Sequence, residues 1–116
     1  ILAGMVAVHQ FCSIGNHAFV AGGSLVRKDI PPFVKAAREP ISYVGINSVG
    51  LRRRGFDSKV IMEIQSIYRT LYQKKYNNTQ AVKIIEGEME ATKERDEIIQ
   101  FIQNSQRGIM KGYFQN

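Results

Sequence analysis

Aliphatic residues recur at every sixth position along the first quarter of the chain. The series is Leu2, Val8, Ile14, Val20 and Val26. A helix would place its apolar residues three and four positions apart, and a half-buried strand would place them two apart. A period of six is instead typical of a solenoid, in which each six-residue unit forms one short strand and one corner. We therefore expect a parallel β-solenoid with these side chains in its core.

Small residues complete the pattern, because a tight corner leaves little room for side chains. Ala3, Gly15 and Ala21 each follow an aliphatic position, and glycine tolerates the backbone angles of a sharp corner. A solenoid of only five units buries little surface, since each unit depends on its neighbours for burial. We expect these residues to be the last coils of a longer solenoid.

The repeat ends in the segment "DIPPFVKAAREP". Pro31 and Pro32 have no N–H group to donate, so they fit poorly in a continued sheet. Residues 33–56 are predicted to form a crossover that contains a short extended part over residues 41–51. From Asp57 onward the apolar spacing becomes helical.

Three helices are predicted beyond residue 56. Asp57 or Ser58 would cap the first, Thr79 would cap the second, and the third would cover residues 93–107 and stop at Gly108. Each apolar face is predicted to pack against the rest of the chain and not to bind a cofactor. These faces comprise Val60, Ile61, Ile64, Ile67, Tyr68, Leu71 and Tyr72, then Ala81, Val82, Ile85 and Met89, then Ile98, Ile99, Phe101 and Ile102.

The net charge of +6 is concentrated in the first half of the chain. Residues 1–56 hold seven Lys or Arg against two acidic residues, and residues 57–116 hold nine against eight. The densest basic run is Arg52–Arg54 in "GLRRRGF", which is either a solvated surface or a site for an anionic partner. We expect no nucleic-acid partner, because aromatic residues do not alternate with the basic ones as stacking platforms would require.

The single cysteine, Cys12, excludes an internal disulfide and fits a reducing compartment such as the cytoplasm. Its neighbours match no nucleophile signature, so we expect a buried structural thiol. No run of about 18 apolar residues occurs, and we therefore expect no integral membrane segment.

Four uncommon strings occur in one order: "AVHQFCSIG", "DIPPFV", "VGIN" and "GLRRRGF". Together they resemble the C-terminal half of the UDP-N-acetylglucosamine O-acyltransferases of lipid A biosynthesis, closely so over residues 1 to 72. The resemblance implies the end of a left-handed parallel β-helix followed by a C-terminal helical domain. On this basis, residues 1–32 are the last coils, residues 33–56 are a crossover and substrate-binding segment, and residues 57–116 are the helical domain.

The resemblance also implies an activity, namely transfer of a 3-hydroxyacyl chain from acyl carrier protein to the 3-hydroxyl of UDP-N-acetylglucosamine. It implies a cytoplasmic homotrimer of the Gram-negative bacterial type, with active sites between neighbouring subunits and neither metal nor cofactor. The general base of the family is a His in a motif resembling "NAHIAHD", which this chain lacks. We expect that His upstream of residue 1, and we expect this chain alone to be inactive.

The resemblance implies binding roles for six residues. His9 and Gln10 would contact the nucleotide, Asn47 would bind substrate from the neighbouring subunit, and Arg53 and Arg54 would contact the phosphates. A sixth residue, Gly22, would act as a ruler that leaves room for a long acyl chain. The alternatives are a structural His9, a solvated arginine run and a Gly22 that only turns a corner.

Two other functions remain open at this point. One is a different hexapeptide-repeat acyltransferase, such as the N-acyl type. The other is a trimerisation or binding module without catalytic activity.

Overall fold

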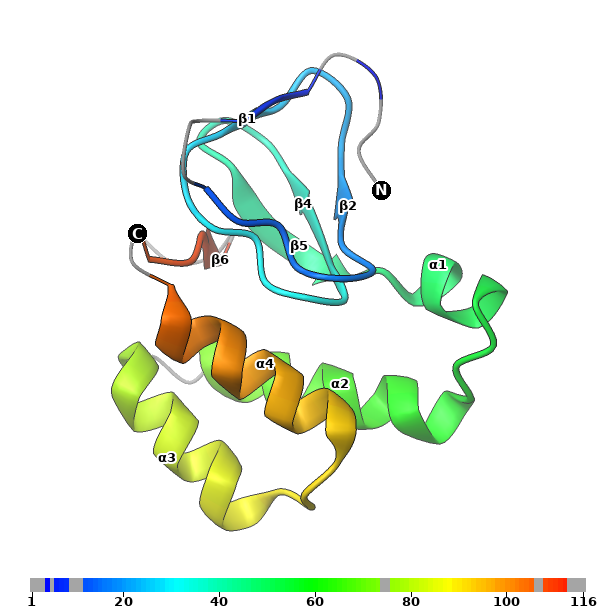
Figure 1. Cartoon of the computed structure of the whole chain (residues 1–116), viewed down its shortest axis with the longest axis vertical. Coiled ribbons are helices and arrows are strands. Elements are labelled where there is room, and N and C mark those ends of the chain that lie inside the picture. Colours follow the sequence, from blue (N-terminus) through cyan, green and yellow to red (C-terminus); the bar gives the residue numbers. More distant parts are fainter. Residues whose placement is uncertain (1–3, 5, 9–11, 74–75, 106–107, 113–116) are drawn as a thin grey trace.

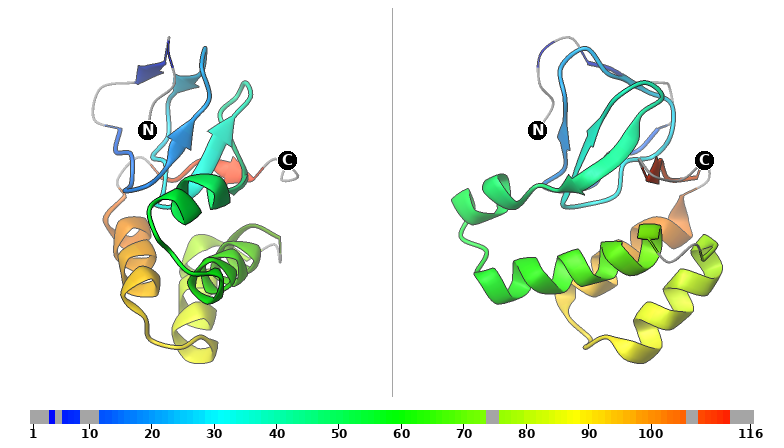
Figure 2. Two further views of the ribbon diagram at one scale, coloured as in Figure 1. Left: turned by 90° about the vertical axis from the view of Figure 1, so that its right-hand side faces the viewer. Right: turned by 180° about the vertical axis from the view of Figure 1, so that it is seen from behind.

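Short strands wrap into triangular coils at one end of the molecule, and helices pack beneath them (Figure 1). The computed structural model describes residues 4, 6–8, 12–73, 76–105 and 108–112. Helix α2 runs under the coils and α3 lies farthest from them in every view (Figure 2). None of the helices within these ranges is long and apolar enough to cross a bilayer.

The first coil has the length that the six-residue repeat predicts. Strand β1 (Ala7–Val8) pairs in parallel with β3 (Leu25–Val26), and Ala7 lies opposite Leu25, eighteen residues later. Eighteen residues are three units of six, one for each side of the triangle. The side chains of Val20 and Val26 are fully buried. The predicted solenoid is therefore confirmed in this part of the chain, and so is its core at Val20 and Val26. The prediction of a core position is wrong for Val8, which is 40% exposed, and Ile14 is half-buried; Leu2 lies outside the described residues.

The next coil is two residues shorter. Strand β2 (Phe19–Val20) pairs in parallel with β4 (Val34–Ala37), and Phe19 lies opposite Lys35, sixteen residues later. The bridge between Ile14 and Ile30 has the same offset. The strict period of six therefore ends between Val26 and Ile30.

The expectation that the sheet stops at the two prolines is wrong. Pro31 and Pro32 lie between the bridge at Ile30 and the start of β4, where their missing N–H groups are not needed. Their neighbours donate instead, Ile30 N–H to the carbonyl of Ser13 (2.9 Å) and Phe33 N–H to that of Asn16 (2.9 Å). Parallel pairing therefore continues beyond residue 32.

The crossover forms a strand and a short helix. Strand β5 (Ser42–Ile46) pairs antiparallel with β4, and helix α1 (Ser48–Arg53) follows directly. The predicted extended segment over residues 41–51 is thus correct up to Ile46 and wrong beyond it. Near the C-terminus, β6 (Lys111–Gly112) returns to pair in parallel with β5, which gives the sheet order β2-β4-β5-β6.

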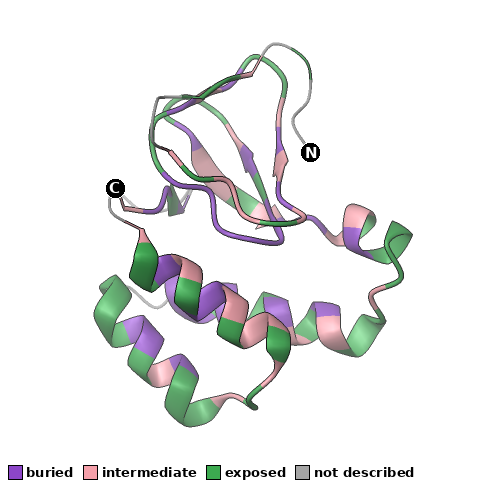
Figure 3. Ribbon diagram, in the orientation of Figure 1, coloured by how far each residue is buried: buried purple, intermediate pink, exposed green. Residues whose placement is uncertain are grey.

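Three further helices follow, with apolar faces close to those predicted (Figure 3). They are α2 (Ser58–Gln73), α3 (Asn78–Glu88) and α4 (Lys93–Asn104). Within the described residues, thirteen positions on these helices are buried, and Thr70 alone lies outside the predicted faces. The other twelve are Ile61, Ile64, Ile67, Tyr68, Leu71, Tyr72, Ala81, Val82, Ile85, Ile98, Ile99 and Ile102. Packing therefore accounts for these stripes.

Local capping chemistry sets the ends of the helices. Asp57 caps α2, because its carboxylate accepts the N–H of Val60 at 3.0 Å. The prediction of Thr79 as the cap of α3 is wrong: Asn77 caps it, in a reciprocal pair with Gln80. Helix α4 ends at Asn104, four residues before the predicted stop at Gly108.

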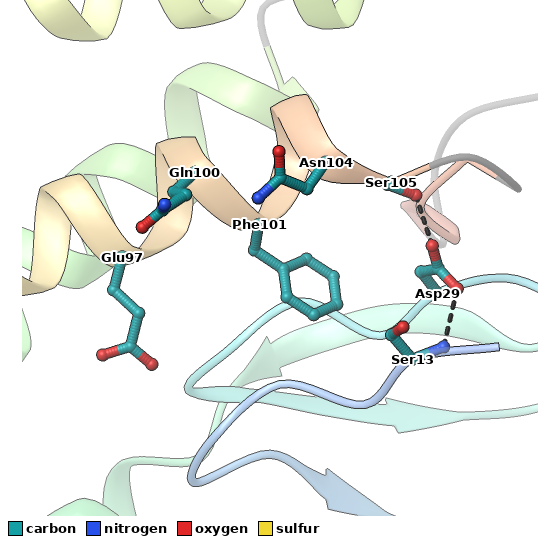
Figure 4. A pocket seen from close by; sticks show the side chains of 7 residues that line it. All are labelled: Ser13, Asp29, Glu97, Gln100, Phe101, Asn104 and Ser105. Atoms are coloured by element: carbon teal, nitrogen blue, oxygen red, sulfur yellow. Dashed lines mark hydrogen bonds between the residues drawn. The ribbon is translucent and has the colours of Figure 1, made fainter.

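The carboxylate of Asp29 joins the coils to the helical domain (Figure 4). It accepts the N–H of Ser13 at 2.8 Å and the O–H of Ser105 at the end of α4. The backbone of Asp29 also pairs with the C-terminal segment, donating to the carbonyl of Gly108 and accepting from the N–H of Met110, both at 3.0 Å. One buried residue thus holds three separate parts of the chain.

Three stacked tyrosines join α2 to the sheet. The rings of Tyr43 and Tyr72 lie 4.4 Å apart between centroids, and Tyr68 stacks on Tyr43 at 5.6 Å. Tyr68 donates its O–H to the carbonyl of Pro32, and Tyr72 donates to that of Met110 at 2.8 Å.

Cys12 is half-buried, which is less than expected, and its thiol points to the carbonyl of Val26.

Gly15 allows the first and second coils to approach each other. A Cβ at this position would overlap the backbone of Pro31 and Pro32. We predict that Gly15→Ala lowers the free energy of unfolding by about 1–3 kcal/mol, because the overlapping atoms belong to the backbone and cannot rotate away. Urea unfolding would measure it. Gly87→Ala is the matched control: it has open space in α3 and should raise stability by about 0.5 kcal/mol. Equal effects of the two changes would contradict the prediction.

The tyrosine cluster predicts a loss of stability in alkaline solution. Burial raises the pKa of Tyr43 to about 12, and burial also raises the pKa of Tyr68 and Tyr72. Unfolded tyrosines lose their protons near pH 10, so above that pH the unfolded state binds fewer protons than the folded one. The free energy of unfolding should therefore fall as the pH rises from 10 to 12. Below pH 10 these tyrosines stay protonated in both states, so they should not make the free energy of unfolding depend on pH. Denaturation at a series of pH values would measure the slope.

Tyr43→Phe should reduce that slope, because it removes one of the groups that titrate. Tyr76→Phe, at an exposed position, should leave it as in the wild type. An unchanged slope in Tyr43→Phe would show that Tyr43 does not carry the effect.

Candidate functional site

A pocket of about 240 Å³ opens between the corner at residues 16–17 and helix α1. We call it the α1 pocket, and its lining is Asn16, His17, Asn47, Gly50 and Arg54. Two of the residues predicted to bind substrate, Asn47 and Arg54, therefore lie together. They come from the separate strings "VGIN" and "GLRRRGF", which the short helix α1 brings to one place.

Asn47 holds the walls of the α1 pocket together. Its side-chain oxygen accepts the N–H of Gly50 at 3.3 Å, which caps α1, and its side-chain amide donates to the carbonyl of His17 at 3.1 Å. Its own N–H donates to the carbonyl of Phe33 at 2.7 Å. The residue is 8% exposed. Asn47 thus has a structural role that the sequence prediction did not include.

His17 forms the opposite wall, on an aromatic support. Its ring stacks on Phe33 with centroids 5.9 Å apart and meets Phe56 edge-on at 5.2 Å. His17 and Phe33 both have positive φ, 61° and 72°. Side chains other than glycine rarely adopt that conformation, and it persists only where the surroundings impose it. The sequence predictions gave no role to His17. The one signal for it in the sequence was that two polar residues, Asn16 and His17, occupy a corner where the repeat favours small residues.

The arginine run supplies positive charge to the α1 pocket. Arg52 and Arg53 end α1 and Arg54 follows it; all three are exposed. Within the described ranges, none of the three forms an ion pair. Arg54 lines the pocket, whereas Arg53 is not part of its lining. No carboxylate lines it either, so a guanidinium, an imidazole and two carboxamides face the space. This set of groups suits an oxyanion such as phosphate.

Among the predicted site residues that the structure describes, Arg53 and Gly22 do not line this pocket. Gly22 is exposed in the turn between β2 and β3, next to Gly23, and it is not part of the lining. His9 and Gln10 lie outside the described residues. Among the residues that are described, no group of three or more His, Cys, Asp or Glu is placed to hold a metal ion.

A second cavity, of about 270 Å³, lies between the coils and α4 (Figure 4). Its lining comprises Ser13, Asp29, Glu97, Gln100, Phe101, Asn104 and Ser105. Its two carboxylates already have partners: Asp29 accepts from Ser13 and Ser105, and Glu97 accepts the side-chain N–H of Asn16 at 3.2 Å. None of the predicted binding residues that the structure describes lines it, so the α1 pocket is the stronger candidate.

Comparisons with known proteins agree with one another. The sequence model of a family described as UDP N-acetylglucosamine O-acyltransferase, domain 2, matches residues 29–110. The acyl-[acyl-carrier-protein]–UDP-N-acetylglucosamine O-acyltransferase of Myxococcus xanthus is 40% identical over 111 residues, which are 96% of this chain and 43% of that protein. The chain thus spans less than half the length of the curated relatives it matches.

Solved structures give the same result. A UDP-N-acetylglucosamine acyltransferase from Bacteroides fragilis has a TM-score of 0.93 at 44% identity, over 95% of this chain and 43% of that one. One from Francisella novicida has a TM-score of 0.90 at 36% identity, over 97% and 42%. The predicted fold class, the end of a left-handed parallel β-helix followed by a helical domain, is confirmed.

Removing the side-chain amide of Asn47 should loosen the α1 pocket. We predict that Asn47→Ala lowers the free energy of unfolding by about 1–3 kcal/mol, because it removes the cap of α1 and leaves the carbonyl of His17 without its donor. Chemical denaturation would measure it. Asn78→Ala, at an exposed position in α3, is the control and should change stability by less than about 0.5 kcal/mol. If the Asn47→Ala variant were as stable as the wild type, Asn47 would not have the structural role described above.

Proposed function

We propose, since the chain belongs to the UDP-N-acetylglucosamine O-acyltransferase family, that it is the C-terminal part of an enzyme that acylates UDP-N-acetylglucosamine. The enzyme would transfer a 3-hydroxyacyl chain from acyl carrier protein to the 3-hydroxyl of the sugar, in the first step of lipid A biosynthesis. One observation carries the proposal: Asn47 and Arg54, from two family strings, line one donor-rich pocket.

The proposed reaction is a direct acyl transfer. The sugar 3-hydroxyl oxygen attacks the thioester carbonyl, a new ester bond forms, the carbon–sulfur bond breaks and the carrier thiol leaves. A general base takes the proton of the hydroxyl. That base would be the family His expected upstream of residue 1. We therefore propose that the residues described here bind and orient substrate and that the chain alone is inactive.

Each binding residue has a distinct role in this proposal. Arg54 and Arg53 hold the phosphates, because a guanidinium pairs with two oxygens at once. Asn47 fixes the α1 pocket and contacts the substrate through its remaining hydrogen-bonding capacity. His9 and Gln10 contact the nucleotide, and Gly22 leaves space for the end of the acyl chain. The active enzyme would be a cytoplasmic homotrimer whose sites lie between neighbouring subunits.

Removing the Arg54 guanidinium should weaken sugar-nucleotide binding. We predict that Arg54→Ala raises the dissociation constant for UDP-N-acetylglucosamine about tenfold, the effect of losing one charge-assisted contact. Calorimetric titration of the complete enzyme at two ionic strengths would measure it, and salt should weaken the wild type more than the variant. Lys83→Ala, which removes an exposed charge from α3, is the control. A wild-type protein that assembles without binding the sugar nucleotide would instead indicate a trimerisation module.

Filling the space at Gly22 should shorten the preferred acyl chain. We predict that Gly22→Met shifts donor preference toward shorter acyl groups, because the longer side chain occupies the end of the acyl groove. Competition between acyl carrier proteins loaded with short and long chains would measure the ratio of kcat/KM values. Gly4→Met, at an exposed glycine with open space around it, is a control for the effect of bulk alone. If the ratio of kcat/KM values for short and long donors were unchanged, Gly22 would serve only to turn the corner and not to measure the acyl chain.

A further inference from the structure

We propose that His17 is a further substrate-binding residue, whose imidazole contacts the diphosphate of the sugar nucleotide in the α1 pocket. The inference rests on the proposed function and deepens it. It starts from the position of the His17 ring in the wall of the pocket that Arg54 also lines.

The structure fixes the ring of His17 from two sides. Phe33 lies parallel to it, with an interplanar angle of 10°, and Phe56 meets it at 73°. The carbonyl of His17 accepts the side-chain N–H of Asn47 at 3.1 Å, which secures the backbone of the corner. A ring held in this way loses little conformational freedom when a ligand binds, so its contacts contribute more to affinity.

The polar atoms of this ring have no hydrogen-bond partner among the residues that the structure describes. Across the described part of the chain, neither ring nitrogen of His17 takes part in a hydrogen bond, and the residue is only half-buried. A neutral imidazole offers one N–H donor and an imidazolium offers two.

The surroundings of His17 favour a negatively charged ligand. Arg54, Asn16 and Asn47 line the same pocket, and the lining contains no carboxylate. The carboxylate of Glu97, outside the lining, accepts one side-chain N–H of Asn16 at 3.2 Å. Phosphate oxygens accept hydrogen bonds from the guanidinium, the imidazole and the carboxamides. In the proposed substrates the phosphates belong either to the sugar nucleotide or to the pantetheine arm of the acyl donor. We assign the pocket to the sugar nucleotide because Arg54, which we propose to hold its phosphates, lines the same pocket.

Two variants separate binding from packing. His17→Phe keeps an aromatic ring against Phe33 and Phe56 but removes both nitrogens. His17→Asn suits the positive φ of this position, because Asn adopts it more readily than most residues, but removes the ring. Both would be made in the complete enzyme, and melting temperatures would show whether each variant folds.

We expect His17→Phe to fold, with a melting temperature lowered by the cost of a bulky ring at positive φ, and to bind UDP-N-acetylglucosamine and UDP about tenfold more weakly. Uridine, which has no phosphate, should bind to variant and wild type alike. Wild-type affinity for UDP in the folded variant would overturn the proposal. So would an equal loss for uridine, or a rise in the KM for the acyl donor with the KM for the sugar nucleotide unchanged.

The wild-type enzyme gives an independent test if His17→Phe does not fold. In protein labelled with ¹⁵N-histidine, addition of UDP should shift the ring-nitrogen resonances of His17, which are identified by their absence in His17→Asn. Uridine should shift them less. Resonances that do not respond to UDP would overturn the proposal. A wild-type enzyme that binds no sugar nucleotide at all would instead show that the proposed function has failed.

Discussion

The buried carboxylate of Asp29 is the contact on which the arrangement of the two halves depends. A carboxylate removed from water is costly unless its oxygens are satisfied, and here both accept hydrogen bonds, one from the coil at Ser13 and one from Ser105 at the end of α4. Its backbone holds the C-terminal segment as well, through Gly108 and Met110. The end of α4 and the C-terminal segment are thus fixed to the coils at the point where the second coil shortens.

The α1 pocket depends on a second set of contacts, made by Asn47. Its walls come from a coil corner, from Asn47, which follows β5, and from α1 and the residue after it. The side chain of Asn47 joins the corner to α1, and its backbone N–H bonds the carbonyl of Phe33. The strained backbone at His17 and Phe33 is maintained by this packing and by the ring of Phe56. The same short helix places Arg54 opposite His17. Structural constraint and proposed binding chemistry therefore depend on the same few residues.

The sequence was most informative where a regular period reflects a regular structure. The six-residue repeat predicted the eighteen-residue coil, and helical spacing predicted the faces that carry Ile64 and Ile98. Single local choices were harder to predict. Pro31 and Pro32 lie at a corner where the parallel pairing requires no N–H donor. Asn77 caps α3 in place of Thr79 because it can pair reciprocally with Gln80. These outcomes depend on register and on contacts that a period does not contain.

The site was predictable only in part for the same reason. Asn47 and Arg54 belong to recognisable strings, whereas the position of the His17 ring depends on Phe33 and Phe56, which are distant in sequence.

The most direct test of the account is a crystal structure of the complete enzyme with UDP-N-acetylglucosamine bound. The account predicts that the diphosphate lies in the α1 pocket, within hydrogen-bonding distance of Arg54 and His17. A sugar nucleotide bound elsewhere, with the α1 pocket empty, would contradict it.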